Sequence, residues 1–365
     1  MLNDAQKPTL PHLPMEISVT PFTVHKRVPL TISRGTTAKS TNLWVRIAAE
    51  GMEGWGEATP FSVDNQRQTT EVIQQELASL IPPLRAVHPL QQQLIEPLLS
   101  SVGSAVRAAI DVALHDWLGK RVGLPLWQLW GLDRDRIGPT AVTVGLSKPD
   151  AAIQRWQQWQ AQVSTVQSIK VKLGSPEGIQ ADQAMLSALL PQIPSGTKVS
   201  VDANGGWHLA DAIVMADWLA ERGVTYIEQP LPVELDGVLE ELSARSPLPI
   251  FVDESCFTSQ DIPRLAEAVQ GINIKLMKAG GLSEALRMIH TARACGLQVM
   301  FGCYSDSTLS NTALTHLAPL ADHLDLDSHL NLTDDPFQGA TIHAGRLLPN
   351  DAPGLGLIHH ELSHR

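Results

Sequence analysis

The stretch SIKVKLG, residues 168–174, is one of eight short apolar runs whose regular spacing decides the fold. The runs recur about every 25 residues: TAVTVGL (140–146), SIKVKLG (168–174), KVSVDAN (198–204), VTYIEQP (224–230), LPIFVDES (248–255), GINIKLM (271–277), LQVMFGC (297–303) and HLDLD (323–327). Amphipathic helical stretches such as AAIQRWQQWQAQV (151–163) fill most of the gaps, and this alternation indicates βαβ units and a parallel sheet. No glycine-rich dinucleotide fingerprint follows any run, so we predict a (β/α)8 barrel rather than an open doubly wound sheet.

The residues before the barrel predict a smaller α+β domain. Short β-rich runs from Met15 to Ala58 favour an antiparallel meander, with HKRVPLTISRGTTAKS (25–40) as a mobile loop. Residues 66–80 and 103–121 have helical periodicity. We therefore expect four parts: a leader at 1–14, an α+β capping domain at 15–138, the barrel at 139–337, and a tail at 338–365, for which packing on the capping domain is a hypothesis.

Composition excludes several classes of partner. The chain has 365 residues, 43% of them hydrophobic and 18% charged, and a formal net charge of −11. That charge argues against nucleic acid or an anionic membrane as a partner. No apolar run approaches the roughly 20 residues needed to span a bilayer. Three cysteines, an odd number without metal-type spacing, indicate a reduced cytoplasm.

Three acidic residues occupy equivalent places in the barrel repeat. Asp202, Glu228 and Asp253 stand at the ends of the third, fourth and fifth runs, 26 and 25 residues apart. The C-terminal ends of barrel strands meet at one rim, where these carboxylates would repel one another unless a cation joins them. Oxygen ligands with open positions for water or substrate favour Mg²⁺. One such acid alone would more often be a helix cap or a turn residue, but three in phase favour a metal site.

Lysines flank these acids. Lys170 and Lys172 share one strand face, and adjacent ammonium groups lower each other's pKa, although two solvated lysines on an exposed face are the alternative. Lys275 ends the sixth run, directly across the barrel, whereas we expect Lys278 to be a loop or helix-start residue. An amine on each side of a substrate suits removal of a proton α to a carboxylate from one face and its return to the other, with inversion at carbon.

These motifs resemble the enolase superfamily, muconate-lactonizing subgroup, over nearly the whole chain. The matching motifs are KVK (170–172), VDAN (201–204), IEQP (227–230), VDES (252–255) and NIKLMKAGG (273–281), and AAIDVALHDWLGKRVGLPLWQLWG (108–131) is similar to the subgroup's capping-domain signature. The resemblance implies an enolase-like fold with Mg²⁺ as cofactor. It implies metal ligands at Asp202, Glu228 and Asp253, an acid/base pair at Lys172 and Lys275, and a neighbour that supports enolate charge at Lys170.

The eighth run separates members of the subgroup. HLDLDSHLNL places Asp325 and Asp327 on one strand face, similar to the Asp-x-Asp feature of dipeptide epimerases, which holds the free α-ammonium of the dipeptide. A cap at the strand end is the alternative for this pair. Ser328 and His329 differ from the more apolar continuation of the best-known epimerases, so the preferred side chains stay open.

Further substrate contacts are implied by the same resemblance. They are Thr143 on the first run, Cys303 and Ser305 after the seventh, and Arg34, which would clamp a substrate carboxylate. Packing explains Cys303 equally well, and a solvated loop position explains Arg34.

The resemblance predicts Mg²⁺-dependent epimerisation of a dipeptide at the α-carbon of its C-terminal residue, with L-Ala-D/L-Glu from murein peptides as one candidate substrate and a homo-oligomer as the assembly. Within the superfamily, N-acylamino-acid racemisation, o-succinylbenzoate formation and muconate cycloisomerisation are the alternatives, but those substrates lack a free ammonium. A non-catalytic barrel is the alternative from another class.

Overall fold

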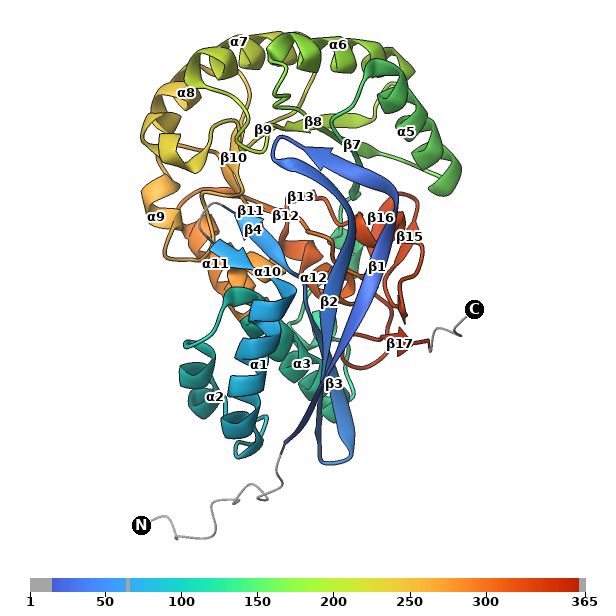
Figure 1. Cartoon of the computed structure of the whole chain (residues 1–365), viewed down its shortest axis with the longest axis vertical. Helices are drawn as coiled ribbons and strands as arrows, with labels where there is room; N and C mark the ends of the chain where they lie inside the picture. Colours follow the sequence, from blue (N-terminus) through green and yellow to red (C-terminus); the bar gives the residue numbers. More distant parts are fainter. Residues whose placement is uncertain (1–14, 64–65, 361–365) are drawn as a thin grey trace.

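A parallel β-barrel forms the larger part of the molecule (Figure 1). The computed structural model describes residues 15–63 and 66–360. The barrel strands are β6 (Ala141–Val144), β7 (Ser168–Lys172), β8 (Lys198–Asp202), β9 (Ile227–Glu228), β10 (Ile250–Val252), β11 (Gly271–Ile274), β12 (Gln298–Phe301) and β13 (His323–Leu324). They pair in chain order, and a parallel bridge between Thr140 and Leu324 joins the first strand to the last. Every strand lies inside its predicted run, so the predicted barrel is confirmed.

Helices cover the outside of the barrel, and Figure 1 shows α5 to α8 as an arc around it at the top of the view. The helices of this part are α5 (Pro149–Gln162), α6 (Ile179–Leu189), α7 (Leu209–Ala220), α8 (Leu239–Arg245), α9 (Ile262–Leu265), α10 (Leu276–Ala279), α11 (Leu282–Ala294) and α12 (Thr308–Thr315). Because helices pack on one side and barrel side chains fill the other, the barrel strands are buried on both faces. In β7, for example, only Ser168 is not fully buried.

The N-terminal part is an antiparallel sheet packed against helices. It contains β1 (Glu16–Ile32), β2 (Gly35–Ala49), β3 (Met52–Ala58), β4 (Phe61–Val63), β5 (Gln66–Gln68), α1 (Thr70–Arg85), α2 (Gln92–Leu99), α3 (Ser104–Val122) and α4 (Leu126–Leu129). The predicted mobile loop at 25–40 is wrong. Strands β1 and β2 continue through it, with a register shift between His25 and Leu30.

The tip of the β1–β2 hairpin reaches the mouth of the barrel. There the Ser33 hydroxyl and the Arg34 guanidinium both donate hydrogen bonds to the Asn204 carbonyl, 2.8 and 2.9 Å away. On the barrel side, the Leu146 amide donates to the Thr31 carbonyl at 2.9 Å. The hairpin is therefore held against the barrel, because two of its side chains and the Thr31 carbonyl have hydrogen-bond partners there.

The last segment returns to the N-terminal sheet. It contains β14 (Phe337–Gln338), β15 (Thr341–His343), β16 (Arg346–Leu348) and β17 (Ile358–His359). The His359 ring stacks on Trp44 of β2 with centroids 4.3 Å apart, and the Leu355 amide donates to Asp116 of α3 at 2.8 Å. The domain boundaries expected from sequence stay a prediction, and the leader expected at 1–14 lies outside the described residues.

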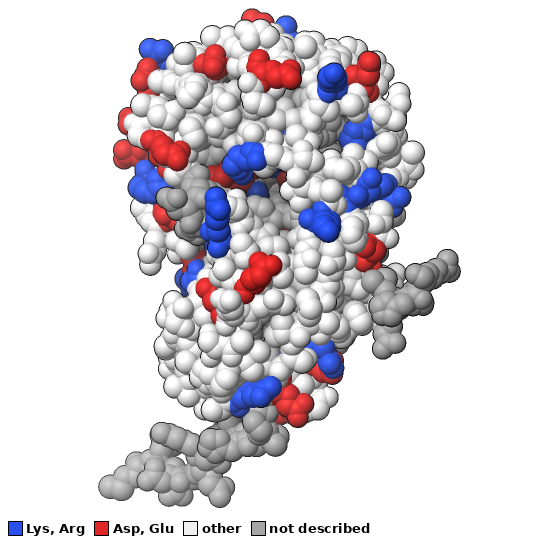
Figure 2. Space-filling model, viewed as in Figure 1, with Lys and Arg blue, Asp and Glu red and all other residues white. Residues whose placement is uncertain are grey.

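The surface carries charges of both signs. Figure 2 shows Lys and Arg interspersed with Asp and Glu over the face that it draws, without a broad field of either sign. Within residues 15–63 and 66–360, no helix is long and apolar enough to cross a bilayer.

Candidate active site

Three buried lysine–carboxylate ion pairs stand at the C-terminal ends of the barrel strands. They are Lys172–Asp202 at 2.5 Å, Lys170–Glu228 at 2.5 Å and Lys275–Asp253 at 2.6 Å. Backbone register explains part of this grouping, because Lys172 lies opposite Asp202, and Asp202 lies opposite Glu228 on the next strand. The structure thus brings together all six residues that the sequence analysis placed at this rim.

Burial and opposite charge set the protonation of these groups. Burial, together with the charges of Asp202 and Asp253, raises the pKa of Glu228 to about 7. Burial alone would lower the pKa of Lys170, but Asp325 and Glu228 outweigh it and hold that pKa well above its ordinary value. The expectation that adjacent ammonium groups lower each other's pKa is therefore wrong for Lys170, because two carboxylates lie 2.5 Å from its Nζ.

The three acids fit a cation by their chemistry, although their present geometry favours the lysines. Asp202, Glu228 and Asp253 are almost fully buried, and the charges of both aspartates raise the pKa of the glutamate, as expected of neighbouring like charges. Over the described residues, no three His, Cys, Asp or Glu side chains converge closely enough to hold a metal ion. The reason is that each carboxylate is turned toward its lysine partner.

Three residues around this rim were missed or misjudged from sequence. Asn204 Nδ2 donates to Asp202 Oδ2 at 3.1 Å, and Asn273 Nδ2 donates to Glu228 Oε1 at 2.6 Å. Strand alternation could have found Asn273, because it stands two residues before Lys275 and shares its face. Lys278 was expected to be a loop or helix-start residue; it lies in the four-residue helix α10, but its burial and the 2.5 Å between its Nζ and Asp253 Oδ1 were not foreseen.

A second group of acids lies beside the first strand. The Thr143 amide donates to Asp327 Oδ2 at 2.7 Å, and its hydroxyl donates to Asp325 Oδ1 at 3.3 Å. Asp325 Oδ2 also lies 2.5 Å from Lys170 Nζ, which links this group to the ion pairs. Strand β13 ends at Leu324, so both aspartates follow the strand rather than lie on it.

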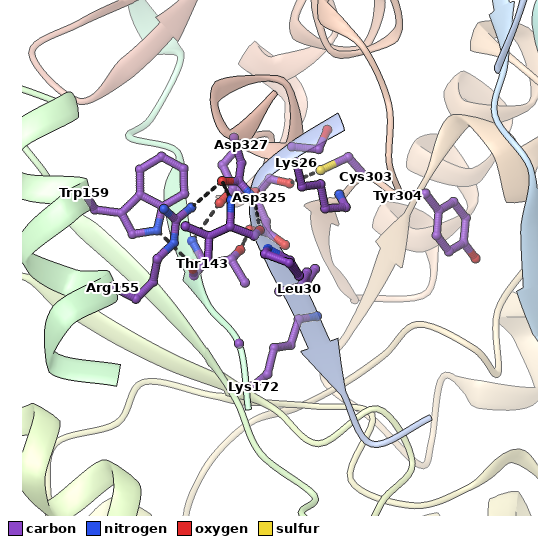
Figure 3. Close-up of a pocket in the computed structure, with 15 residues that line it drawn as sticks. Lys26, Leu30, Thr143, Arg155, Trp159, Lys172, Cys303, Tyr304, Asp325 and Asp327 are labelled. Carbon is purple, nitrogen blue, oxygen red and sulfur yellow. Dashed lines mark hydrogen bonds between the residues drawn. The ribbon is translucent and has the colours of Figure 1, made fainter. Parts of the chain in front are cut away.

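A cavity of about 60 Å³ joins the two groups. Its lining includes Lys172, Thr143, Asp325, Asp327 and Cys303, and Figure 3 shows the two aspartates at one end with Lys172 at the other. The Cys303 thiol donates to the Asp325 carbonyl at 3.3 Å. Burial and the charges of both aspartates raise the pKa of the thiol to about 12, so it is uncharged near neutral pH.

Arg34 and Ser305 lie apart from this cavity. Arg34 Nη2 forms an ion pair with Glu254 Oε1 at 2.5 Å and lines a neighbouring cavity of about 400 Å³ that Asn204 also lines. Ser305 is not among the residues that line the 60 Å³ cavity, and its carbonyl accepts a hydrogen bond from Asn42 of β2 at 3.0 Å. Their predicted substrate contacts stay predictions.

A parallel barrel with acids and lysines at its strand ends and an α+β domain at its N-terminus defines the enolase-like class. The chain belongs to the mandelate racemase/muconate lactonizing enzyme family: residues 15–131 match the N-terminal domain of that family, and residues 152–361 match the enolase C-terminal domain-like family. The resemblance noted from sequence is thus confirmed.

Relatives with known activities cover nearly the whole chain. A hydrophobic dipeptide epimerase of a Flavobacteria bacterium is 42% identical over 94% of this chain and 97% of its own length. A second protein of that name, from Roseobacter litoralis, is 43% identical over 93% and 96%. The structure of a dipeptide epimerase from Enterococcus faecalis, complexed with Mg and the dipeptide L-Leu-L-Tyr, superposes with a TM-score of 0.87 at 29% identity, covering 95% of this chain and all of the other.

Proposed function

We propose that this protein is a Mg²⁺-dependent dipeptide epimerase that inverts the α-carbon of the C-terminal residue. The observation that carries the proposal is the single cavity that contains Lys172 at one end and Asp325 and Asp327 at the other. A base and an ammonium-binding pair in one cavity suit a substrate with both a weakly acidic α-proton and a free amine. The two relatives above 40% identity are dipeptide epimerases, which supports this reading.

The lysines would move the proton. Lys172 ends the second barrel strand and Lys275 follows the sixth. These strands are four apart in a sheet of eight, so the two lysines would face the substrate from opposite sides. One would take the α-proton as general base and the other would return a proton to the opposite face as general acid. Lys170, held between Glu228 and Asp325, would keep its charge and stabilise negative charge on the enediolate.

Asp202, Glu228 and Asp253 would hold Mg²⁺. Oxygen donors from three neighbouring strands match the preference of this hard cation. The ion would supply positive charge beside the substrate carboxylate, which lowers the barrier to α-proton removal. Lys172 and Lys275 are the present partners of Asp202 and Asp253, at 2.5 and 2.6 Å, so both lysines stand beside the acids that would hold the ion.

Asp325 and Asp327 would hold the α-ammonium of the dipeptide. Thr143 fixes both carboxylates, so the pair is already oriented before substrate arrives. N-Acylamino acids, o-succinylbenzoate precursors and muconates have no such ammonium, so they could not use the two aspartates in this way. We further propose a homo-oligomer in a reducing cytoplasm, in line with the three free cysteines.

Deuterium exchange tests the function. The protein with Mg²⁺ would be incubated in deuterium oxide with hydrophobic dipeptides, L-Ala-L-Glu and an N-succinylamino acid, and uptake of one deuteron at the α-carbon would be followed by mass. We expect exchange with dipeptides, and its loss on chelation of the metal. Turnover of the N-succinylamino acid with no dipeptide exchange would contradict the proposal.

Asp327→Asn tests the ammonium site. Dipeptide exchange should fall at least about a hundredfold, because a charge-assisted contact is lost at a buried position. Asp150→Asn, at the exposed start of α5, is the matched control. Full activity of Asp327→Asn would mean that the ammonium binds elsewhere.

A further inference from the structure

Lys26 of β1 is a buried ammonium group inside the same cavity. Its side chain lines the cavity together with Asp327 and Cys303, and the residue is only 9% exposed. Among residues 15–63 and 66–360, no side chain forms an ion pair with it within 4.0 Å. Buried charges are usually paired, so an unpaired lysine that lines a cavity can offer its ammonium to an acceptor on a bound substrate.

The surroundings of Lys26 compensate its charge only in part. Burial lowers the pKa of Lys26, while Cys303, Asp327 and Asp306 oppose that effect. Cys303 supplies no charge near neutral pH, because the pKa of its thiol is about 12. Arg155, which stacks 4.0 Å from the Trp159 ring on the same cavity wall, adds a second positive charge.

Substrate binding would remove part of that compensation. On the proposed function, the dipeptide ammonium neutralises Asp327, which is one of the two carboxylates whose charge raises the pKa of Lys26. Asp306 would remain, but burial and the charge of Glu57 raise its pKa to about 6, and it already accepts the Tyr304 amide at 3.1 Å. Lys26 would then keep Asp306 as a compensating carboxylate, but among the described residues it has no side-chain hydrogen-bond partner, unlike Arg155, whose Nη2 donates to Asn331 Oδ1 at 3.0 Å.

The position of Lys26 identifies which part of the dipeptide it meets. Figure 3 shows Lys26 beside Cys303 and the two aspartates, while Lys172 lies at the far end beyond Leu30. If the ammonium sits on the aspartates and the reacting α-carbon beside Lys172, the residue nearest Lys26 is the N-terminal one. Its side chain would extend along a wall formed by Val28, Pro29 and Leu30 and end at the lysine.

We propose that Lys26 makes this enzyme selective for dipeptides whose N-terminal residue has a carboxylate side chain. The inference rests on the proposed function and names the substrate class within it. A carboxylate matches the buried ammonium both as a hydrogen-bond acceptor and as a charge, whereas an amide matches it only as an acceptor. An aliphatic side chain would leave Lys26 without an acceptor.

Paired substrates test the selectivity. Values of kcat/KM would be measured for L-Glu-L-Leu, L-Gln-L-Leu and L-Leu-L-Leu, from α-deuterium uptake with Mg²⁺ present. For the native protein we expect L-Glu-L-Leu to exceed L-Gln-L-Leu by about tenfold or more, since charge-assisted hydrogen bonds are roughly twice as strong as neutral ones. In Lys26→Met the ratio should fall to about one, and Lys26→Arg should retain part of the preference.

Lys198→Met is the matched control, because Lys198 is exposed at the opposite, N-terminal end of β8. It should keep the native ratio. A native ratio near one, or a ratio that survives Lys26→Met, would overturn the inference. A Lys26-dependent preference for L-Leu-L-Glu over L-Leu-L-Gln would overturn the assignment to the N-terminal residue. Absence of exchange with every dipeptide would instead refute the proposed function itself.

Discussion

At the residue scale, the charge state of Asp327 limits the pH range of the reaction. Burial and the neighbouring charge of Asp325 raise the pKa of Asp327 to about 6. The ionised form is the one that can hold an ammonium, so kcat/KM should be maximal above that pKa and fall as pH decreases through about 6. A pH profile of kcat/KM checks this, because it reports groups of the free enzyme. Activity that is unchanged down to pH 5 would contradict it.

The two opposed lysines should each serve one face of the substrate. Lys172→Ala and Lys275→Ala should each abolish epimerisation, with a loss of about 10²–10⁴-fold expected for removal of a general acid or base. Each variant retains one of the two lysines. It should therefore still exchange the α-proton of the one stereoisomer whose α-proton faces the remaining lysine. Deuterium uptake measured separately with the L,L and L,D dipeptides distinguishes the two variants. Equal loss with both isomers would argue against a two-base mechanism.

Charged residues at the ends of the barrel strands could be predicted from sequence, whereas Lys26 and Arg155 could not. Strand periodicity located Lys172 and Asp202 because neighbouring strand ends must meet at one rim. Lys26 was not predicted as a site residue, because it belongs to β1 of the N-terminal part and lines the cavity only through the packing of that part on the barrel. Arg155 was not predicted either, because a cationic side chain on an amphipathic helix normally faces solvent.

At the element scale, α3 of the N-terminal part holds the start of α11. Asp111 of α3 accepts the Ser283 amide at 3.1 Å and the Ser283 hydroxyl at 2.5 Å. This approach requires a glycine at 281, where a Cβ would stand 2.4 Å from Asp111 Oδ2. The backbone there also has a φ of +118°, which disfavours residues with a side chain.

Gly281→Ala should therefore disrupt both stability and activity. Gly296→Ala is the matched control, because Gly296 also has a positive φ of 77° but open space around its Cβ position. We expect the control to lower the free energy of unfolding by about 1–2 kcal/mol and Gly281→Ala by more. Only Gly281→Ala should also reduce kcat. Gly281 lies two residues after the end of α10, and α10 begins directly after Lys275, so a shift at Gly281 would move that lysine. Denaturant unfolding and steady-state rates measure the two effects, and equal losses in both variants would show that Asp111 moves aside freely.

The local sequence pattern predicted the strands of the barrel, but it did not predict the β1–β2 hairpin. Apolar β-branched runs at a regular period favour strands whatever surrounds them. Residues 25–40 are polar, and their extended conformation depends on partners across the hairpin and on the barrel, such as Asn204. Tertiary contacts of that kind override a local composition that is typical of loops.

At the scale of the whole molecule, an aromatic cluster fastens the last segment to the N-terminal sheet. The Phe337 ring contacts the rings of Phe22, Trp44 and His359 with centroids 5.4–5.5 Å apart. Phe337 is also buried, at 5% exposure. Composition could not reveal this arrangement, because Phe22 and Trp44 lie about 300 positions before Phe337 in the sequence.

Phe337→Ala should accordingly lower the free energy of unfolding of the whole chain by about 3–5 kcal/mol, the usual loss for a buried aromatic ring. Phe337→Leu keeps most of the apolar volume and should cost much less. Because Phe337 of the last segment packs on the N-terminal sheet, unfolding followed by tryptophan fluorescence should coincide with unfolding followed by far-UV circular dichroism in the native protein. In Phe337→Ala the fluorescence transition should move to lower denaturant, since Trp44 loses its ring contact. A loss below about 1 kcal/mol with coincident transitions would mean that the sheet and the barrel are held together by other contacts, foremost the packing of α3 on β3 and on α10.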